Sequence, residues 1–394
     1  MTPIRVGIIG LSAAATGTNW AATAHLPYLL KSPHYAITAL CNSSVEAAQK
    51  AVKAYALPET TKTYGSPEDL ANDPEVDLVV ANTRVDKHAQ VLLASLKKGK
   101  DVFCEWPLDR NAAVTREMLD AAREGGGRVM VGLQGRQSPT LKNVKSLIDE
   151  GRIGKVLSSS VIGAAGNGGG EESTAVRYFV EREVGGNMFT IQFGHGGSLS
   201  RLTVSHPKTS HRRYTAIDLI LYTLGELKQY STILGNQRPE TRIVDRSSNT
   251  IMETVVKNSP DQVLLQGTLT TGPILSVHVR GGRGFASKPK FLWRIYGEKG
   301  EIEVTASGTG LNVGYDDEQI LLDDFEKGTL ETVSVDTDEW DELPRQARNV
   351  ARLYEAFRKG KGDGIATFDE AVERHKMLDG MYEAWDKGDQ GRLA

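Results

Sequence analysis

This 394-residue sequence has few cysteines, little excess charge of either sign and no long apolar runs. Its only cysteines, Cys41 and Cys104, lie in apolar strand-like runs, so a disulfide framework is excluded and a reducing compartment is expected. The formal net charge of -3 gives no electrostatic reason to expect nucleic acid or a membrane surface as a partner. No apolar run reaches membrane-spanning length, and no signal peptide precedes the first strand. We therefore expect a soluble cytoplasmic protein.

The order of the apolar patterns predicts two domains, since 394 residues exceed one ordinary core. Up to residue 133, buried-strand patterns alternate with helical patterns, which is typical of a doubly wound parallel sheet in an α/β fold. From Val156 onward, close-set strands without intervening helices predict an antiparallel sheet with an exposed face, and two helical stretches close the chain. We predict an α/β domain over residues 1–133 and an α+β domain with a large open antiparallel sheet over residues 134–394.

The first strand and the turn after it indicate a nucleotide site. Ile4–Ile9 is an apolar run that predicts a strand buried on both faces, and a helical pattern follows the turn. Small residues in the turn let the backbone approach a pyrophosphate, and the helix N-terminus offers free N–H groups. The G-x-G-x-x-G pattern is degraded to Gly10-x-Ser12-x-x-Ala15. We interpret residues 1–133 as a dinucleotide-binding (Rossmann) domain; the alternative is a doubly wound fold that binds nothing there.

The residues after the second predicted strand, Ala36–Cys41, bear on the choice of coenzyme. An acid that holds the ribose hydroxyls is expected there, but the sequence has Asn42, Ser43 and Ser44. Without a carboxylate nothing repels a 2′-phosphate, and the hydroxyl and amide groups offer it hydrogen bonds. We therefore expect NADP, or little preference between NADP and NAD. The alternative is that these residues simply cap the next helix.

Further polar residues follow the next two predicted strands, at the edge where ligands of a doubly wound sheet bind. Thr83 and His88 come after the strand Val76–Ala81, and Glu105 and Pro107 come after the strand Asp101–Cys104. We assign all four to the cofactor site.

The chain resembles the glucose–fructose oxidoreductase and inositol dehydrogenase (Gfo/Idh/MocA) family over nearly its whole length. The resemblance rests on the opening strand and turn and on four further motifs: His25-Leu26-Pro27, Gly99-Lys100-x-Val102 leading to Glu105-x-Pro107, Gly297-x-x-Gly300, and Thr367-Phe368-Asp369-Glu370-Ala371. A branch of that family, the catalytically silent fungal galactose-pathway repressors, is more similar at residues 133–139, 166–169, 193–195 and 260–269. The resemblance implies a bound NAD or NADP and a homodimer formed through the open sheet.

Two departures from the family pattern concern catalysis. Active members carry Glu-Lys-Pro, whose lysine helps relay the proton of the reacting hydroxyl, and Trp106 stands at that lysine here; indole is neither acid nor base at neutral pH. A family aspartate is replaced by Ile191, whereas the histidine of the same segment survives as His195. The resemblance makes His195 or Tyr178 the candidate for proton transfer, and we expect Trp106 to stack near the nicotinamide or substrate.

The substrate side of the predicted site has two candidates. Arg136 either pairs with a substrate anion or braces the domain interface, and Asn167 is assigned to substrate binding. We predict no metal site, because the spacing of five between His206 and His211 is not a convincing ligand motif.

Two functions stay open. One is an NAD(P)-dependent oxidoreductase acting on a sugar, polyol or other small hydroxyl or carbonyl compound. The other is a catalytically silent, dinucleotide-binding transcriptional regulator, which works through a protein partner without contacting nucleic acid and would also enter the nucleus. Trp106 and Ile191 favour the regulator; we lean to the oxidoreductase.

The stretch Gly196–Ala216 has the composition of neither neighbour, with four basic residues and no acid. The family motif that ends at His195 runs almost directly into a helix, which here begins near Ile217. We interpret this stretch as translated intron sequence retained in the chain; the alternative is a lid over the substrate.

Overall fold

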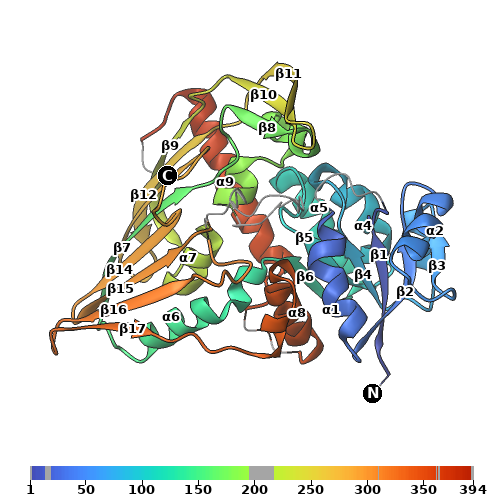
Figure 1. Ribbon diagram of the computed structural model, residues 1–394, viewed down its shortest axis with the longest axis horizontal. Coiled ribbons are helices and arrows are strands. Elements are labelled where there is room, and N and C mark those ends of the chain that lie inside the picture. The colour runs from blue at the N-terminus through green and yellow to red at the C-terminus, as the bar shows by residue number, and fades with distance from the viewer. Residues whose placement is uncertain are drawn as a thin grey trace. The chain divides into compact units, whose positions relative to one another are not determined.

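The computed structural model describes residues 2–13, 19–194, 217–308, 310–360, 362 and 364–391. The chain forms two compact units (Figure 1). The first unit consists of Met1–Gln134, Glu183–Gly186 and Trp340–Lys376. The second consists of Gly135–Arg182, Asn187–Glu339 and Met377–Ala394. Part of the C-terminal third of the chain is therefore built into the first unit.

A six-stranded parallel sheet forms the centre of the first unit, in the order β3-β2-β1-β4-β5-β6. The predicted doubly wound fold is confirmed. The strand order reverses beside β1, between β2 and β4, and the carboxyl ends of these strands are where a doubly wound sheet binds its ligand. The strands are β1 (Ile4–Ile9), β2 (Tyr35–Cys41), β3 (Lys62–Tyr64), β4 (Leu78–Ala81), β5 (Asp101–Glu105) and β6 (Val129–Gly132).

Several helices of the first unit begin at residues whose side chains cap them. Ser44 accepts from the Ala47 N–H at the start of α2, and Asn111 does the same for α5. Instead of one helix after β1, the chain has a π-helical turn, Ala21–His25, followed by a short α-helix with Pro27 near its start. The helices are α1 (Leu26–Lys31), α2 (Val45–Ala54), α3 (Pro67–Asn72), α4 (His88–Lys97), α5 (Ala112–Gly125) and α8 (Arg345–Arg358).

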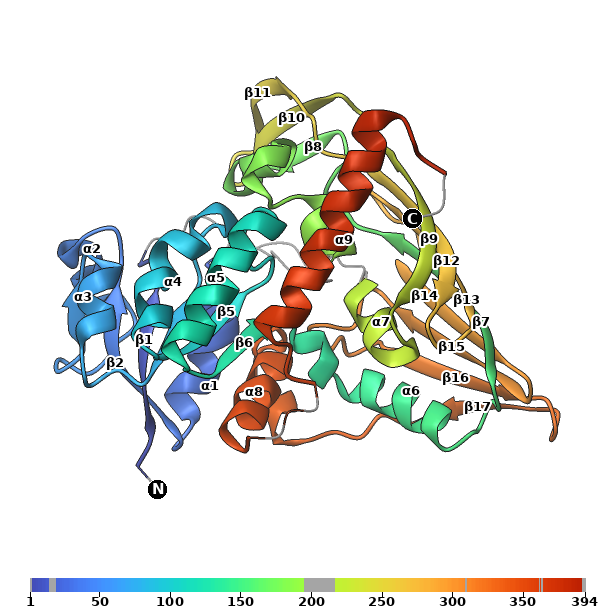
Figure 2. The same ribbon diagram turned by 180° about the vertical axis from the view of Figure 1, so that it is seen from behind.

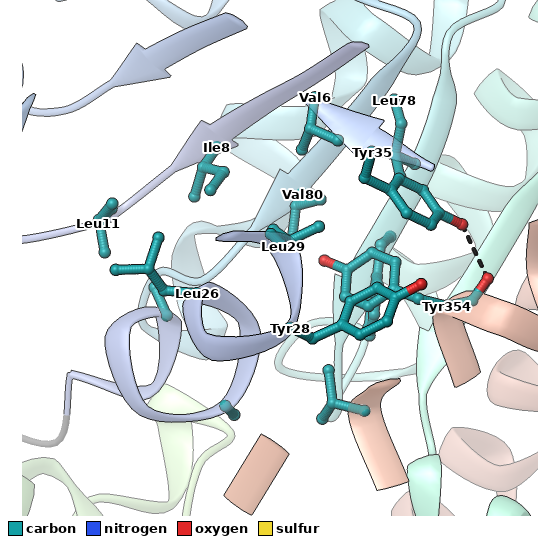
Figure 3. Close-up of a cluster of buried hydrophobic side chains, with 14 of the residues drawn as sticks. Val6, Ile8, Leu11, Leu26, Tyr28, Leu29, Tyr35, Leu78, Val80 and Tyr354 are labelled. Atoms are coloured by element: carbon teal, nitrogen blue, oxygen red, sulfur yellow. Dashed lines mark hydrogen bonds between the residues drawn. The ribbon is translucent and has the colours of Figure 1, made fainter. Parts of the chain in front are cut away.

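Helix α8 completes the core on one face of this sheet. Its apolar residues lie in the same cluster as side chains of β1, β2, β4 and α1. Tyr354 of α8 is fully buried among them, and the Tyr35 hydroxyl donates to its carbonyl oxygen over 2.8 Å (Figure 3). Burial of apolar side chains stabilises a fold by roughly 25 cal/mol per Å². The apolar residues of α8 therefore contribute substantially to the stability of the first unit.

The second unit is built on an eight-stranded sheet in the order β17-β16-β15-β14-β7-β13-β12-β9. Neighbouring strands are antiparallel, except for the parallel pair β13 and β7. The open-sheet expectation is confirmed. The strands are β7 (Val156–Ala164), β9 (Leu227–Gly235), β12 (Gln262–Leu269), β13 (Ile274–Arg280), β14 (Phe291–Gly297), β15 (Gly300–Ala306), β16 (Gln319–Asp324) and β17 (Thr329–Val333).

The two faces of this sheet differ in exposure. Along β14, Phe291, Trp293 and Ile295 are buried, whereas Arg294 and Tyr296 point to the other face and are exposed. Helices α6 (Pro139–Asp149) and α7 (Ile217–Leu224) lie together on one side of the sheet (Figure 2). In the part of the chain that the structure describes, no helix covers the other face (Figure 1).

A small sheet and a C-terminal helix are further parts of the second unit. A small sheet, β11-β10-β8, contains β8 (Glu171–Ser173), β10 (Glu240–Asp245) and β11 (Thr250–Val256). Helix α9 (Phe368–Lys387) runs from the first unit into the second. No helix among the described residues is both long and apolar enough to cross a membrane.

Candidate functional site

Gly10 lies directly after β1, where the loops that follow β1, β2 and β4 meet. Its N–H donates to the Cys41 carbonyl over 3.0 Å, and its φ of 94° lies in the region that favours glycine. A Cβ at this position would come within 2.8 Å of the Asn82 carbonyl oxygen. Only glycine therefore lets the backbone after β1 pass this close to the end of β4.

The residues after β4 carry buried polar atoms that have no partner among the described residues. They are Nδ2 and Oδ1 of Asn82 and the hydroxyl of Thr83. An unpaired buried amide is costly, and such groups in native structures mark a missing water, ion or ligand. Thr83 was predicted here, but Asn82 was missed, although its position directly after a buried strand is the signal that would have found it. These donors and acceptors fit the hydroxyl and phosphate groups of a dinucleotide.

The residues after β2 are largely occupied by contacts within the protein. Asn42 Nδ2 donates to the carbonyl oxygens of Leu11 (2.8 Å) and Ala47 (3.4 Å). Ser44 caps α2, as the alternative interpretation of this stretch required. Ser43 is exposed. Of the three residues assigned to the cofactor, Ser43 alone is exposed, and the Glu46 carboxylate of α2 interacts with its neighbour Ser44.

The loop after Gly10 is held by two side chains that the sequence reasoning did not select. The Ser12 carbonyl oxygen accepts from Asn19 Nδ2 (3.0 Å) and from the Tyr55 hydroxyl (2.7 Å). Asn19 Nδ2 also donates to the Tyr55 hydroxyl oxygen, so each of the three residues is hydrogen-bonded to the other two. Ala15, the third position of the degraded glycine pattern, lies outside the described residues.

Glu105 ends β5 at the same edge of the sheet. Its Oε1 lies 2.8 Å from Nε2 of the buried His25. Its Oε2 lies over Gly132, where a Cβ would come within 2.6 Å of that oxygen. Glycine at this position of β6 therefore makes room for the carboxylate.

His88 connects the loops after β4 and β5 and is buried. Its Nδ1 lies 3.0 Å from the Pro107 carbonyl oxygen, and its Nε2 lies 3.1 Å from that of Thr83. His88 and Pro107, which were both predicted to bind the cofactor, thus contact each other and join the loops at the carboxyl edge of the sheet. Their position at the edge agrees with the prediction, and their contacts are internal.

Trp106 is 5% exposed, and its indole packs against the ring of His375, 4.8 Å between centroids. Complete burial lowers the pKa of His375 to about 3, with a smaller contribution from His88, so the imidazole is neutral at physiological pH. The ring that Trp106 contacts is therefore a neutral histidine of α9. The sequence reasoning expected a nicotinamide or substrate beside this indole.

Arg136 belongs to the second unit and makes a buried bidentate ion pair with Asp218 of α7. Nε and Nη2 lie 2.9 and 2.8 Å from the two carboxylate oxygens, and both residues are almost fully buried. The guanidinium also lies 4.9 Å from the centre of the Tyr222 ring. The anion beside Arg136 is thus a carboxylate of the chain itself.

Asn167 lies in a buried polar network of the second unit. Its amide donates to Glu172, and its Oδ1 accepts from Gln192 over 2.6 Å. The second carboxylate oxygen of Glu172 accepts from the Gly168 N–H over 2.6 Å. This network holds the turn around Asn167 to the π-helical segment Met188–Phe193, and the buried Oε1 of Gln192 has no partner among the described residues.

Ile191, at the position of the family aspartate, is part of a small apolar cluster with Val176 and Phe179. Tyr178 is half-buried against the same cluster. The position that carries a carboxylate in active relatives is therefore apolar here, and a phenol lies next to it.

His195 and the stretch Gly196–Ala216 lie outside the described residues. Among the residues that are described, no group of three or more His, Cys, Asp or Glu side chains is placed to hold a metal ion.

Two known domain families match the chain. Residues 4–133 match the oxidoreductase family described as having an NAD-binding Rossmann fold. Residues 139–207 and 213–306 match the Gal80p C-terminal domain. Most of the stretch 196–216 lies within these matched ranges, which weighs against its interpretation as intron sequence.

Individual relatives include both an enzyme and a regulator. The dehydrogenase aclE of Aspergillus oryzae is 27% identical over 98% of this chain and 97% of its own length. The galactose/lactose metabolism regulatory protein GAL80 of Saccharomyces cerevisiae is 30% identical over 77% of this chain, and the match spans 66% of the regulator. The crystal structure of a super-repressor mutant of Gal80p from the same yeast has the same fold, with a TM-score of 0.83 at 24% identity, covering 100% of this chain and 97% of that one. The chain belongs to the Gfo/Idh/MocA oxidoreductase family, in the branch that carries a Gal80p-like C-terminal domain.

Proposed function

We propose that the protein is an NAD(P)-dependent oxidoreductase that acts on a sugar, a polyol or another small hydroxyl or carbonyl compound. The observation that carries the proposal is the set of unpartnered polar atoms of Asn82 and Thr83 beside the close approach at Gly10. Similarity to a dehydrogenase along almost the whole chain adds support.

The residues at this edge fit the parts of a dinucleotide by their chemistry. Gly10 lets the backbone after β1 lie close to Asn82 and Thr83, whose polar atoms offer donors and acceptors to a pyrophosphate. The exposed Ser43 stands directly after β2, where the coenzyme-binding acid is expected, and this favours NADP or leaves little preference between NADP and NAD. When bound, the nicotinamide supplies the hydride acceptor or donor.

The chain's own task is then to take up the proton that leaves the substrate hydroxyl as the carbonyl forms. Trp106 has no exchangeable acid or base, so this task falls to His195 or Tyr178. Tyr178 packs against the apolar cluster that contains Ile191, the position at which the family carries a carboxylate. A phenol there is a suitable proton donor for the reverse reaction.

A regulator is the second candidate function, and a specific observation favours it. Trp106 is buried against His375, and Ile191 lies in an apolar cluster, so two positions that relay protons in active relatives are inert. In that case the dinucleotide is a ligand and not a reactant. The protein then binds a protein partner instead of converting a substrate, and it acts in the nucleus instead of the cytoplasm.

A homodimer through the open face of the large sheet is part of both proposals. The strand registers align Ile233, Leu264, His278, Ile162 and Leu292 in one row across β9, β12, β13, β7 and β14. Ile162 and Ile233 in this row are 58% and 49% exposed. Exposed apolar rows of this kind mark interaction surfaces.

We expect His195→Ala to lower kcat/KM at least roughly tenfold, a cautious floor for losing a general acid or base. Trp106→Phe should keep most of the activity, because the indole takes no part in proton transfer. Steady-state kinetics with an accepted substrate measure both, and Tyr178→Phe identifies which of the two candidates acts. A larger loss in Trp106→Phe than in both other variants would show that the roles are assigned wrongly.

A further inference from the structure

Three side chains of the first unit form a continuous hydrogen-bonded chain that ends at the proposed coenzyme site. His25 Nε2 lies 2.8 Å from Glu105 Oε1, and His25 Nδ1 lies 2.8 Å from the Tyr354 hydroxyl. The residues come from the π-helical turn, β5 and α8, and are up to 329 positions apart. His25 and Tyr354 are fully buried, whereas the Glu105 side chain is 12% exposed. The Tyr354 end of this hydrogen-bonded chain is therefore closed to solvent, and the Glu105 end is accessible.

Aromatic packing fixes the sealed end. The Tyr354 ring is stacked on Tyr28 at 5.3 Å, and the rings of Tyr35 and Phe103 each lie 5.1 Å away (Figure 3). The His25 ring packs edge-on against Phe103 at 4.9 Å. In a closely packed core neither His25 nor the Tyr354 hydroxyl can turn away without disturbing its neighbours.

The hydrogen bonds settle where the protons lie. An ionised carboxylate only accepts, so His25 Nε2 carries the hydrogen that it donates to Glu105. Among the described residues, the Tyr354 hydroxyl has His25 Nδ1 as its hydrogen-bond partner, so it donates to that nitrogen. Tyr354 therefore holds His25 in the tautomer that faces Glu105 with an N–H.

This chain is not a route for protons to solvent. Burial raises the pKa of the Tyr354 hydroxyl well above its usual value of 10. A group that keeps its proton, at the closed end of the chain, can orient its neighbour but cannot pass a proton on.

The open end presents one carboxylate oxygen to a ligand. Glu105 Oε2 lies over Gly132, opposite Glu105 in the register of β5 and β6, at the sheet edge where Asn82 and Gly10 also lie. A carboxylate repels phosphate and accepts from hydroxyl groups. We propose that His25 and Tyr354 are positioning residues that hold Glu105 so that Oε2 accepts a hydrogen bond from a ribose hydroxyl of the bound dinucleotide; this rests on the proposed coenzyme site.

The test combines two readouts on the full chain. Nitrogen NMR of the imidazoles, recorded without coenzyme, reports the tautomer of His25, and calorimetry with NADP and NAD reports affinity. Wild type should show a single tautomer protonated at Nε2. Tyr354→Phe should shift the Nδ1 resonance of His25, which loses its hydrogen-bond partner while Glu105 keeps Nε2 protonated. It should also bind coenzyme up to roughly tenfold more weakly, the loss typical of one hydrogen bond.

Tyr28→Phe is the matched control. It removes a buried hydroxyl from the ring stacked on Tyr354, and that hydroxyl bonds to Glu355 rather than to His25. It should keep both the tautomer and the affinity. His25→Gln, whose amide can still donate to Glu105, should bind coenzyme better than His25→Leu.

Three results would overturn the inference: an unchanged His25 Nδ1 resonance in Tyr354→Phe, an unchanged affinity in that variant, or an equal loss in Tyr28→Phe. If His25→Leu does not fold, the comparison of Tyr354→Phe with Tyr28→Phe tests the inference by itself. A wild type with a single His25 tautomer that binds neither NADP nor NAD would refute the coenzyme site and, with it, the ligand assigned to Oε2.

Discussion

Replacing Gly10 with alanine is expected to weaken coenzyme binding roughly a hundredfold while the protein stays folded. The new Cβ would lie 2.8 Å from the Asn82 carbonyl oxygen, so the loops after β1 and β4 must separate. The backbone at a φ of 94° is also strained for any residue with a side chain. Losing two backbone hydrogen bonds to phosphate corresponds to roughly a hundredfold loss of affinity. Calorimetry with NADP measures it.

Gly126→Ala is the control for backbone strain alone. Gly126 ends α5 with a φ of 75°, but a Cβ there would meet nothing within 4 Å. This variant should lose about 1 kcal/mol of stability and no coenzyme affinity. If Gly10→Ala binds coenzyme as wild type does, the turn after β1 is not the phosphate site.

Replacing Arg136 with methionine should lower the free energy of unfolding by about 3–5 kcal/mol, because it removes the guanidinium that compensates the buried Asp218 carboxylate. The paired groups are only 4% and 1% exposed, and two hydrogen bonds join them. Denaturant unfolding measures the loss. The double variant Arg136→Met with Asp218→Leu should recover much of it, since the stranded charge is then gone.

The surface pair Lys145 and Asp149 in α6 provides the comparison. It has a similar contact distance, 2.9 Å, but its side chains are 36% and 62% exposed. Lys145→Met should cost no more than about 0.5 kcal/mol. An Arg136→Met protein of normal stability with a raised KM would instead show that Arg136 binds substrate.

The parallel sheet could be predicted because its strands are short apolar runs separated by helices with clear caps. Ser66 and Pro67, for example, begin a helix in the structure as their sequence pattern indicates. The eight-stranded sheet was predicted less completely. The strands Leu227–Gly235, Gln319–Asp324 and Thr329–Val333 were missed, because they lie at or next to the sheet edges and carry mixed polar and apolar residues.

The candidate site was predicted by position but not by contact. Glu105 and Thr83 could be placed at the carboxyl edge, because a residue that follows a parallel strand must lie there. Nothing local predicts that Glu105 contacts His25, or that Trp106 lies against His375, since these partners are 80 and 269 residues apart. Such pairs form through tertiary packing, which a single sequence does not reveal.

The most direct test of the central claim is a nicotinamide turnover screen against sugars, polyols and aromatic carbonyls, run with NAD and NADP beside calorimetric titration of both. The proposed function predicts saturable binding, with NADP bound at least as tightly as NAD, and formation or consumption of reduced coenzyme with at least one compound. Tight binding with no turnover of any compound would contradict the oxidoreductase and leave the regulator, and absence of binding would contradict both.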